Sequence, residues 1–412
     1  MSTPEAVDGA VSAPGHRDRR IVITAVGVTQ IFAWGSSYYL PAVLAKPIAA
    51  ETGWSLTWII GGLSLGLLVA GFASPMIGRT IERMGGRPVL ATSAALLAVG
   101  LLILALARSL PSYLAAWLVL GLGMGAGLYD PAFATLGRLY GQDARRAITA
   151  VTLFGGFAST VCWPLSAYLE VKLGWRETCI VYASLQILLA LPTLLWALPR
   201  TDDERLAAPG ISGAPPPVVA RRGGVGIFVL LATVITVGSV LSTVMSVHLL
   251  TVLQAQGMAL AAAVGLGALV GPSQVGARTV EMFVARFHHP IWTKLVSTSC
   301  VALGLLLLWT KAPIILMALV FYGAGIGLES IARGTLPLAI FGAAHYPVIM
   351  GRIARPSLLA QAVAPSVAAA LIELVGLDGT MAVLALAAIG NTCLTVVLFL
   401  LLRPTPPPSR EA

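Results

Sequence analysis

The sequence predicts an all-α membrane protein with twelve transmembrane helices, and three observations support this fold class. Of the 412 residues, 57% are hydrophobic and only 10% are charged, against about a quarter in an ordinary soluble domain. The chain divides into apolar runs of the length that crosses a bilayer, which is about 20 residues. The Lys and Arg residues gather in the short gaps between these runs. Most of the protein surface is therefore expected to face lipid.

The apolar runs fall into two sets of six. They begin near residues 21, 55, 88, 111, 146 and 175, and then near residues 224, 258, 291, 313, 352 and 378. A long polar gap from Pro199 to Gly224, with an acidic stretch and three consecutive prolines, separates the sets and is typical of a flexible linker. We expect a tail (1–20), a six-helix bundle (21–199), a linker (200–223), a second six-helix bundle (224–403) and a tail (404–412).

The two sets resemble each other, which predicts two pseudo-symmetric bundles. Gly125–Leu128 in the fourth run matches Gly325–Leu328 in the tenth, and Thr135-Leu136 matches Thr335-Leu336 at the same offset. Glycines at this spacing also allow helices to approach closely. Two parallel halves around a central site is a known plan among transporters.

The distribution of charge predicts orientation and excludes several function classes. Most of the 26 Lys and Arg residues fall on the side of the N-terminus, so both termini are expected in the cytoplasm. The net charge of +9 lies in these short loops, so nucleic acid is not expected as a partner. The four cysteines have no metal-ligand or disulfide spacing, and no phosphate loop or nucleophile–base pair is evident. No enzyme activity, cofactor, metal or removable signal peptide is expected.

The strongest candidate site lies in the run that begins near residue 258. Gln274, Arg278 and Glu281 recur at steps of three and four residues, so they share one helix face with two glycines, Gly267 and Gly271. A guanidinium matches a carboxylate with two parallel hydrogen bonds. Arg278 is therefore a candidate anion contact, with Glu281 as its neutralising partner when no substrate is bound. The alternative is that Arg278 extends to the membrane interface at the helix end.

Three further charged residues are expected within the membrane. Glu329 and Arg333 lie four residues apart on one face of the tenth run. They are either a structural ion pair or a pair whose carboxylate couples protons to transport. Asp130 is followed by Pro131 in the fourth run, and three roles are open for it. It partners Arg278 or Arg333 across the cavity, it carries the coupling proton, or it pairs with Arg138 or Arg145 near the helix end.

Two polar stripes are expected to line a water-filled cavity. The first run places Gln30, Trp34 and Tyr38 along one face, and the seventh run does the same with four hydroxyl residues: Ser239, Ser242, Thr243 and Ser246. Ser and Thr also serve in ordinary packing between helices, so each residue alone is weak evidence. We take Gln30, Trp34, Tyr38, Ser242 and Ser246 as candidate substrate contacts, beside Gln274 and Arg278.

The loop after the second apolar run resembles a motif of a known protein family. The segment from Gly78 to Arg87 resembles the loop between helices 2 and 3 of the major facilitator superfamily, with Glu82 in the place of an Asp. Gly174–Arg176 resembles the start of that family's sixth helix. The resemblance covers residues 21–403. It implies alternating access between two six-helix halves, and a latch that holds the cytoplasmic side closed, formed by four loop residues: Arg79, Glu82, Arg83 and Arg87.

Within that superfamily, the chain resembles the monocarboxylate and oxalate/formate porters. The resemblance is carried by Lys46–Ile48, Glu51–Ser55 and Ser74–Gly78, and by an Arg with a nearby carboxylate, here Arg278 and Glu281. The order of these two residues is reversed, and Tyr38-Tyr39 occupy the region where that branch often has a lysine. The drug-antiporter signature, expected at Trp163–Ala167, lacks its glycines.

These observations predict a secondary transporter. We expect a proton-coupled carrier of a small organic anion such as a monocarboxylate, monomeric and in the plasma membrane, with Asp130, Glu281, Glu329 and Arg333 as candidates for proton coupling. The alternatives are an efflux antiporter for a drug or metabolite, and a membrane sensor or scaffold that keeps the transporter fold. The cost of burying Arg and Glu in a membrane argues against a scaffold.

Overall fold

The computed structural model describes residues 18–200 and 224–402, and these residues form helices without any strand. Before the linker, the helices are α1 (Arg19–Gly35), α2 (Leu40–Thr52), α3 (Leu56–Met84), α4 (Gly86–Ala105), α5 (Leu110–Gly127), α6 (Tyr129–Tyr140), α7 (Ala144–Gly156), α8 (Ala158–Leu173), α9 (Trp175–Leu185), the π-helix η2 (Gln186–Ala190) and α10 (Leu191–Ala197). After it, they are α12 (Gly224–Ala255), α13 (Leu260–Gly267), α14 (Val270–Val284), α15 (Pro290–Trp309), α16 (Ile315–Phe341) and α17 (Tyr346–Leu401). We call these two sets the first and second halves.

Within the described ranges, nine helical stretches are long and apolar enough to cross a membrane. Two of them, Leu110–Leu173 with 64 residues and Tyr346–Leu401 with 56 residues, exceed the length of two crossings of a bilayer about 30 Å thick. The pair α13 and α14 forms a further, interrupted stretch. These lengths agree with the expected order of the apolar runs, while the number of twelve crossings stays a prediction. Most of the expected tails and linker lies outside the described residues.

Local chemistry explains where the long helices are interrupted. Gly376 adopts a φ of 73° and a ψ of 175° within α17, a backbone conformation that favours glycine, and it lies near the expected start of the last run at residue 378. Leu128 is extended between α5 and α6, just before Pro131, whose ring disfavours a continuous helix. This second break places Asp130 in the first turn of α6, where the helix dipole stabilises a carboxylate.

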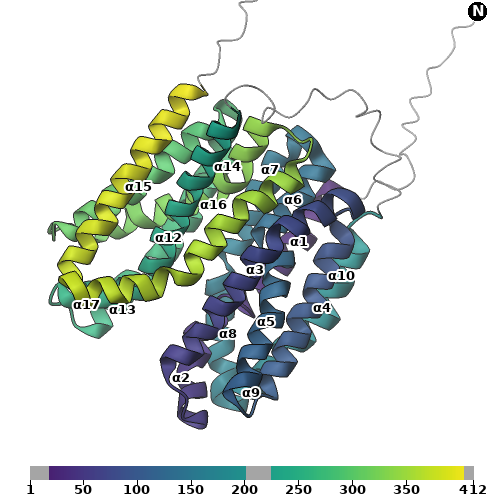
Figure 1. Ribbon diagram of the computed structural model, residues 1–412, viewed down its shortest axis with the longest axis horizontal. Coiled ribbons are helices and arrows are strands. Elements are labelled where there is room, and N and C mark those ends of the chain that lie inside the picture. The colour runs from purple at the N-terminus through teal and green to yellow at the C-terminus, as the bar shows by residue number, and fades with distance from the viewer. Residues whose placement is uncertain (1–17, 201–223, 403–412) are drawn as a thin grey trace, which may run out of the picture.

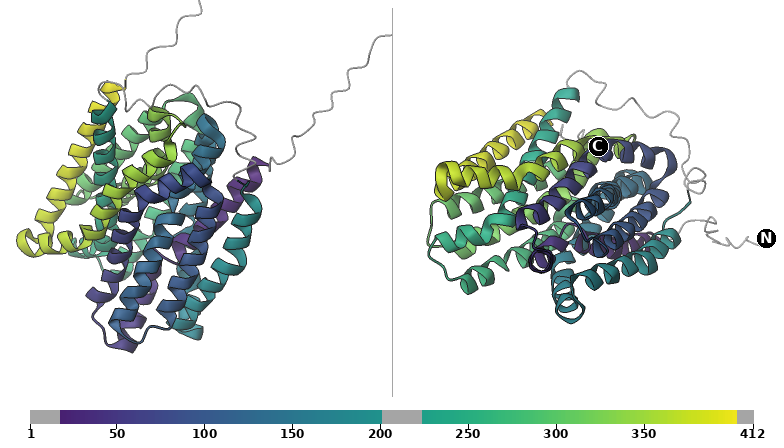
Figure 2. Two further views of the ribbon diagram at one scale, coloured as in Figure 1. Left: turned by 45° about the vertical axis from the view of Figure 1, so that its right-hand side comes forward. Right: turned by 60° about the horizontal axis from the view of Figure 1, so that its bottom comes forward.

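The two halves converge at one end of the molecule and separate at the other. Figure 1 shows the helices approaching one another at the end where α10 ends and α12 begins, which we call the linker end. At the opposite end, α2 and α9 lie well apart from α13 and the bend of α17, and Figure 2 shows the same separation from a second direction. The structure is therefore closed at the linker end.

Close packing at the linker end depends on glycines. A Cβ on Gly78 of α3 would lie 2.4 Å from the carbonyl oxygen of Pro347, and one on Gly351 of α17 would lie 2.4 Å from that of Ser74. The two helices thus approach through reciprocal glycine contacts. Tyr346 is also fully buried here, in an apolar cluster made mainly of residues from the first half. Apolar packing across the halves therefore holds this end together.

The expected repeat is visible in how each half packs. Ser93 of α4 donates a hydrogen bond to the carbonyl of Gly123 at 2.8 Å, and Ser297 of α15 donates to that of Gly325 at 2.9 Å. Each half therefore places a serine against a glycine of the next helix, although the two glycines stand two residues apart in the repeat that matches Gly125 with Gly325. The halves differ further along, because α16 continues where α5 ends.

Candidate functional site

Arg278 is buried between the two halves, with 4% of its surface exposed. Its guanidinium donates from Nε to the carbonyl of Gly327 (3.2 Å), from Nη1 to that of Thr152 (2.8 Å) and from Nη2 to Oε1 of Gln274 (3.3 Å). All three acceptors are uncharged, and no carboxylate of the described residues lies within ion-pair distance of Arg278. A buried, uncompensated cation is costly in a membrane, so this position can receive an anion.

A glycine on the first half makes room for this guanidinium. A Cβ on Gly156, at the end of α7, would lie 2.3 Å from Nη1 of Arg278. The carbonyl of Thr152, one turn earlier, is exposed to the same guanidinium. Arg278 therefore spans from α14 to α7, and the interpretation that it extends to the membrane interface does not fit its burial between helices.

Aromatic side chains from the first half surround the approach to Arg278. The hydroxyl of Tyr129 donates at 3.4 Å to the carbonyl of Thr152, which also accepts from Arg278, and Tyr39 lies within electrostatic reach of the guanidinium. Trp34 links these rings, with centroids 4.9 Å from Tyr129, 5.8 Å from Tyr39 and 5.3 Å from Tyr38. We call Trp34, Tyr38, Tyr39 and Tyr129 the aromatic cluster. These rings form an apolar surface beside a cation. Such a surface suits an organic anion that also carries an apolar group.

The two predicted polar stripes meet across the halves at one point. The hydroxyl of Tyr38 interacts with Thr243 and Ser246 of α12, while Ser242 interacts with Tyr322 of α16. Gln30 does not join them, because it is buried and donates to the carbonyl of Gly127 at 2.6 Å within the first half. Of the predicted substrate contacts, Arg278, Gln274, Tyr38 and Ser246 thus lie along the contact between the halves. Gln30 and Trp34 contact residues of the first half, and Ser242 contacts Tyr322 of its own half.

Glu281 does not pair with Arg278 as the sequence suggested. Its Oε1 accepts from Thr293 at 2.7 Å and lies 3.5 Å from Nη2 of Arg145, while its Oε2 lies 3.4 Å from Nε2 of His288. Arg145 belongs to α7 of the first half, and it also donates to the carbonyl of His288 at 2.6 Å. Partners from neighbouring segments therefore hold Glu281, which bridges the halves at the linker end.

The expected pair of Glu329 with Arg333 is also not formed. Arg333 instead donates two hydrogen bonds to Asp130 of the first half, at 2.7 and 2.8 Å. Glu329 forms an ion pair with Lys294 of α15, which the sequence pattern did not single out. Lys294 is fully buried. The alternative that Asp130 partners Arg333 is confirmed, and its pairing with Arg138 or Arg145 is not observed.

The predicted latch reaches the second half through one residue. Glu82 contacts Nδ1 of His345, in the segment between α16 and α17. Arg87 donates instead to the carbonyl of Leu195 in α10 at 2.6 Å, and Arg79 donates to the carbonyl of Pro75 in its own helix at 3.2 Å. Arg83 is exposed. Of the four predicted latch residues, Glu82 is thus the one with a described contact to the second half, whereas Arg79 and Arg87 pack inside the first half.

His289 caps the N-terminus of α15 at the linker end. Its Nδ1 accepts a hydrogen bond from the backbone N–H of Ile291 at 3.2 Å, which caps α15. Burial, and then the charges of Arg145 and His288, lower the pKa of His289. The ring is therefore neutral at pH 7, as an acceptor must be.

A family model described as Major Facilitator Superfamily matches residues 26–351 of the chain. Among curated proteins, the chain is similar to monocarboxylate transporter 13 of Rattus norvegicus, with 30% identity over 158 residues, and to monocarboxylate transporter 11 of Mus musculus, with 32% identity over 168 residues. These matches cover 37% and 40% of this chain, and 36% and 35% of the two relatives. The chain thus matches only about a third of the length of these relatives.

Solved structures share the fold across nearly the whole chain. The human organic anion transporter MFSD10 (TETRAN) superposes with a TM-score of 0.70 at 16% identity, covering 92% of this chain and 100% of that one. FucP in the outward conformation gives a TM-score of 0.71 at 13% identity, covering 93% and 99%. The proton:xylose symporter XylE gives 0.69 at 14% identity, covering 92% and 94%. At these identities, the likeness concerns the fold alone.

Proposed function

Because the chain belongs to the major facilitator superfamily, and is thus a multi-pass membrane transporter and not an enzyme, we propose that it carries a small organic anion by alternating access. The substrate carboxylate binds Arg278 between the halves. The observation that supports this role is the guanidinium itself, which is buried to 4% exposure and held only by uncharged acceptors. A carboxylate there gains charge-assisted hydrogen bonds in a medium of low dielectric.

Similarity to two monocarboxylate transporters supports the class of substrate, although each match spans only about a third of the relative. The aromatic cluster beside Arg278 favours anions that carry an apolar or aromatic group. We therefore expect lactate and pyruvate to bind more weakly than benzoate or phenylpyruvate, since only the larger anions also contact the rings.

We propose that the linker end faces the cytoplasm of a plasma-membrane protein that works as a monomer, as the position of the Lys and Arg residues suggests. The structure is then the outward-facing state, and three charged contacts between the halves close its cytoplasmic side: Glu82–His345, Glu281–Arg145 and Asp130–Arg333. Without an ATP-binding motif in the sequence, a gradient must drive uphill transport, and we propose that protons supply it.

Uptake into proteoliposomes tests this function. Purified protein is reconstituted, a pH gradient is imposed with the acid side outside, and uptake of labelled lactate, pyruvate, benzoate and phenylpyruvate is measured together with internal pH. We expect uptake of at least one carboxylate, accompanied by proton entry and stimulated several-fold by the gradient. Uptake without any effect of the gradient would remove proton coupling, and uptake of neutral or cationic amphiphiles in place of every carboxylate would favour the efflux alternative.

A further inference from the structure

A buried ion pair inside the second half is not explained by anion binding. Lys294 of α15 is fully buried, and its ammonium group contacts Oε1 of Glu329. An ammonium has three N–H donors, and Glu329 is the acceptor that the described residues provide. On the other side, the hydroxyl of Ser297 lies 3.0 Å from Oε2 of Glu329 and 2.9 Å from the carbonyl of Gly325, and its one proton can go to either acceptor. The ammonium has no second acceptor among the described residues, which makes Lys294 the group from which a proton can leave.

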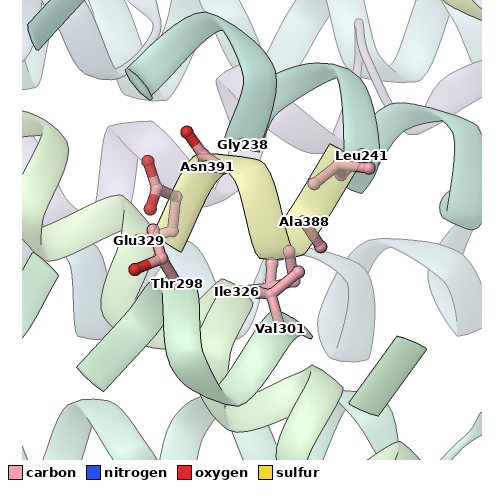
Figure 3. A pocket seen from close by; sticks show the side chains of 8 residues that line it. All are labelled: Gly238, Leu241, Thr298, Val301, Ile326, Glu329, Ala388 and Asn391. Carbon is pink, nitrogen blue, oxygen red and sulfur yellow. The ribbon is translucent and has the colours of Figure 1, made fainter. Parts of the chain in front are cut away.

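A small cavity lies beside this pair. It is lined by Gly238, Leu241, Thr298, Val301, Ile326, Glu329, Ala388 and Asn391, as Figure 3 shows. The space open to a water centre is about 10 Å³, roughly what a single water molecule requires. Asn391 is 3% exposed, and its Oδ1 has no hydrogen-bond partner in the protein. A buried acceptor of this kind, next to a carboxylate, indicates a water site that can receive a proton.

The first half contains a matching cavity without any charge. It is lined by residues of α1, α4, α5, η2 and α10, as the other is lined by α12, α15, α16 and α17, and it also has about 10 Å³ open to a water centre. Its polar residues are neutral and largely satisfied: Gln30 donates to the carbonyl of Gly127, and Gln186 donates to Ser36 at 3.0 Å. The fold therefore does not need an ion pair at this place, and only the second half has one.

The pair is linked electrically to the contact between the halves. Arg333 lies one turn after Glu329 on α16 and interacts with it and with Lys294. It is now engaged by Asp130 of α6, and also donates to Ser239 and Ser357 at 3.0 Å. The charges therefore alternate along the row Lys294, Glu329, Arg333, Asp130 and sum to zero. The segments of α12 and α17 that face this row contribute the uncharged Ser239, Ser357 and Asn391.

Opening the linker end must separate Asp130 from Arg333, because they belong to different halves. Of this row, the second half then keeps two cations, Lys294 and Arg333, with one carboxylate, and an uncompensated buried charge is costly. Arg333 can turn to Glu329 on its own helix, four residues away. In that case Lys294 loses its counter-ion, and the summed charge of these three residues returns to zero when Lys294 loses one proton.

We infer that Lys294 carries the coupling proton, holding it while Arg333 is bound to Asp130 and releasing it to the adjoining cavity when Arg333 moves to Glu329. This inference rests on the proton coupling in the proposed function. The step is balanced: the ammonium becomes a neutral amine, and the proton passes to water and out through the opened linker end. Reprotonation follows once Asp130 takes Arg333 back. One proton thus moves in the same direction as the anion.

The test follows the conformational equilibrium without any anion. Spin labels are placed at Thr57 and Thr310, which are exposed at the end opposite the linker end and lie on different halves. The four native cysteines are replaced, and His288 and His345, which also bridge the halves, are changed to Asn. Distances are then measured by pulsed electron resonance in lipid nanodiscs between about pH 5 and pH 9.

We expect the ratio of the two states in the parent to change by up to about tenfold per pH unit, since they differ by one bound proton. Acid should favour the state that is closed at the linker end. Lys294→Arg should hold that state at every pH, and Lys294→Met should remove the pH dependence and favour the other state. Lys311→Met is the matched control, because Lys311 pairs with Asp378 in an exposed position of the same half, and it should behave as the parent.

Each outcome decides between defined alternatives. If Lys294→Met does not fold because Glu329 is left unpaired, the variant Lys294→Met with Glu329→Gln replaces it and should also be insensitive to pH. A parent-like pH response in either variant would overturn the inference, and its loss in Asp130→Asn alone would place the proton on Asp130. If the parent itself does not respond to pH, proton coupling fails as a whole. A wrong substrate class would leave these distances unchanged and would appear only in the uptake assay.

Discussion

At the scale of single residues, Arg278 differs in its partners from three other cations that lie in the membrane or between the halves. Arg333, Lys294 and Arg145 each face an acid, whereas Arg278 has only carbonyl and amide oxygens around its guanidinium. The sequence predicted Arg278 and Gln274 as site residues, because their spacing places them on one helix face. It could not predict that Glu281 turns to Arg145, since that partner lies in another helix.

Lys294 was missed for a related reason. It stands four residues after Pro290, at the start of an apolar run, where a lysine normally extends to the interface. Its counter-ion in the interior is Glu329 on α16, which lies 35 positions away in the sequence. A signal was present, because Glu329 needed a cation and its equivalent in the first half, Tyr129, does not.

The space that Gly156 leaves for Arg278 gives a prediction. Gly156→Ala would place a methyl group 2.3 Å from Nη1 of Arg278, so the guanidinium must move away from the carbonyl of Thr152. Because a hydrogen bond from a charged group is worth about 1.5–3 kcal/mol, we expect benzoate affinity to fall about tenfold or more in a binding titration. Gly276→Ala on α14 has open space around it and is the control. Equal affinity in both variants would show that Arg278 has freedom to adjust.

At the scale of helices, the apolar runs and the Gly and Pro residues between them predicted about where each run begins. They did not predict where a run is divided into two helices. The break at Leu128 was suggested only by Pro131, and the π-helical turn at Gln186–Ala190 by nothing in the pattern. The first has a consequence for function, because it sets Asp130 at a helix start facing Arg333.

The glycine contact between α3 and α17 predicts an effect on the conformational equilibrium. A Cβ on Gly78 would meet backbone atoms of Pro347, which cannot rotate away. Overpacking of this kind costs about 1–2 kcal/mol, so Gly78→Ala should shift the ratio of the two states about 5- to 30-fold toward the one open at the linker end. Labelling of a cysteine introduced at the linker end measures this shift. Gly61→Ala, on the same helix and without neighbours within 4 Å, should leave labelling unchanged.

The cap of α15 predicts a dependence of stability on pH. Because the pKa of His289 is lowered in the folded protein, the folded state binds fewer protons than the unfolded state, and this cap contributes stability above about pH 6.5, the ordinary pKa of histidine. The contribution is lost as pH falls below that value. Thermal unfolding between about pH 8 and pH 5 should show a smaller loss of stability in His289→Asn, whose amide caps at any pH. An identical loss in parent and variant would contradict this role.

At the scale of the whole molecule, the halves are joined at the linker end by contacts of unequal strength. Glu82 and His345 are 28% and 58% exposed, so their contact is expected to contribute at most about 1 kcal/mol. Glu281 is 5% exposed and has three partners. Glu281→Gln should therefore open the linker end more than Glu82→Gln, judged by labelling of the same introduced cysteine. The reverse order would mean that the exposed contact is the principal latch.

The architecture of the molecule could be predicted from its sequence further than its site could. Hydrophobic runs, the repeat of Gly125–Leu128 at Gly325–Leu328 and the loop at Gly78–Arg87 indicated two halves of a major facilitator transporter. The partners of Asp130, Glu281 and Glu329 depend on how the halves meet, and a single sequence contains little information about that. Residue types predicted that Asp130, Arg278, Glu329 and Arg333 lie within the membrane, but they did not predict the burial of Lys294 or which pairs these residues form.

The central claim is that a substrate carboxylate neutralises Arg278, and equilibrium binding tests it most directly. Lactate, pyruvate, benzoate and phenylpyruvate, each beside its amide, are titrated into the purified parent and into Arg278→Lys and Arg278→Gln. We expect at least one carboxylate to bind the parent and its amide to bind at least tenfold more weakly. Arg278→Lys should weaken binding markedly, because lysine lacks the planar fork, and Arg278→Gln should abolish it. Unchanged carboxylate affinity in Arg278→Gln, or amides that bind as tightly as their acids, would contradict the account.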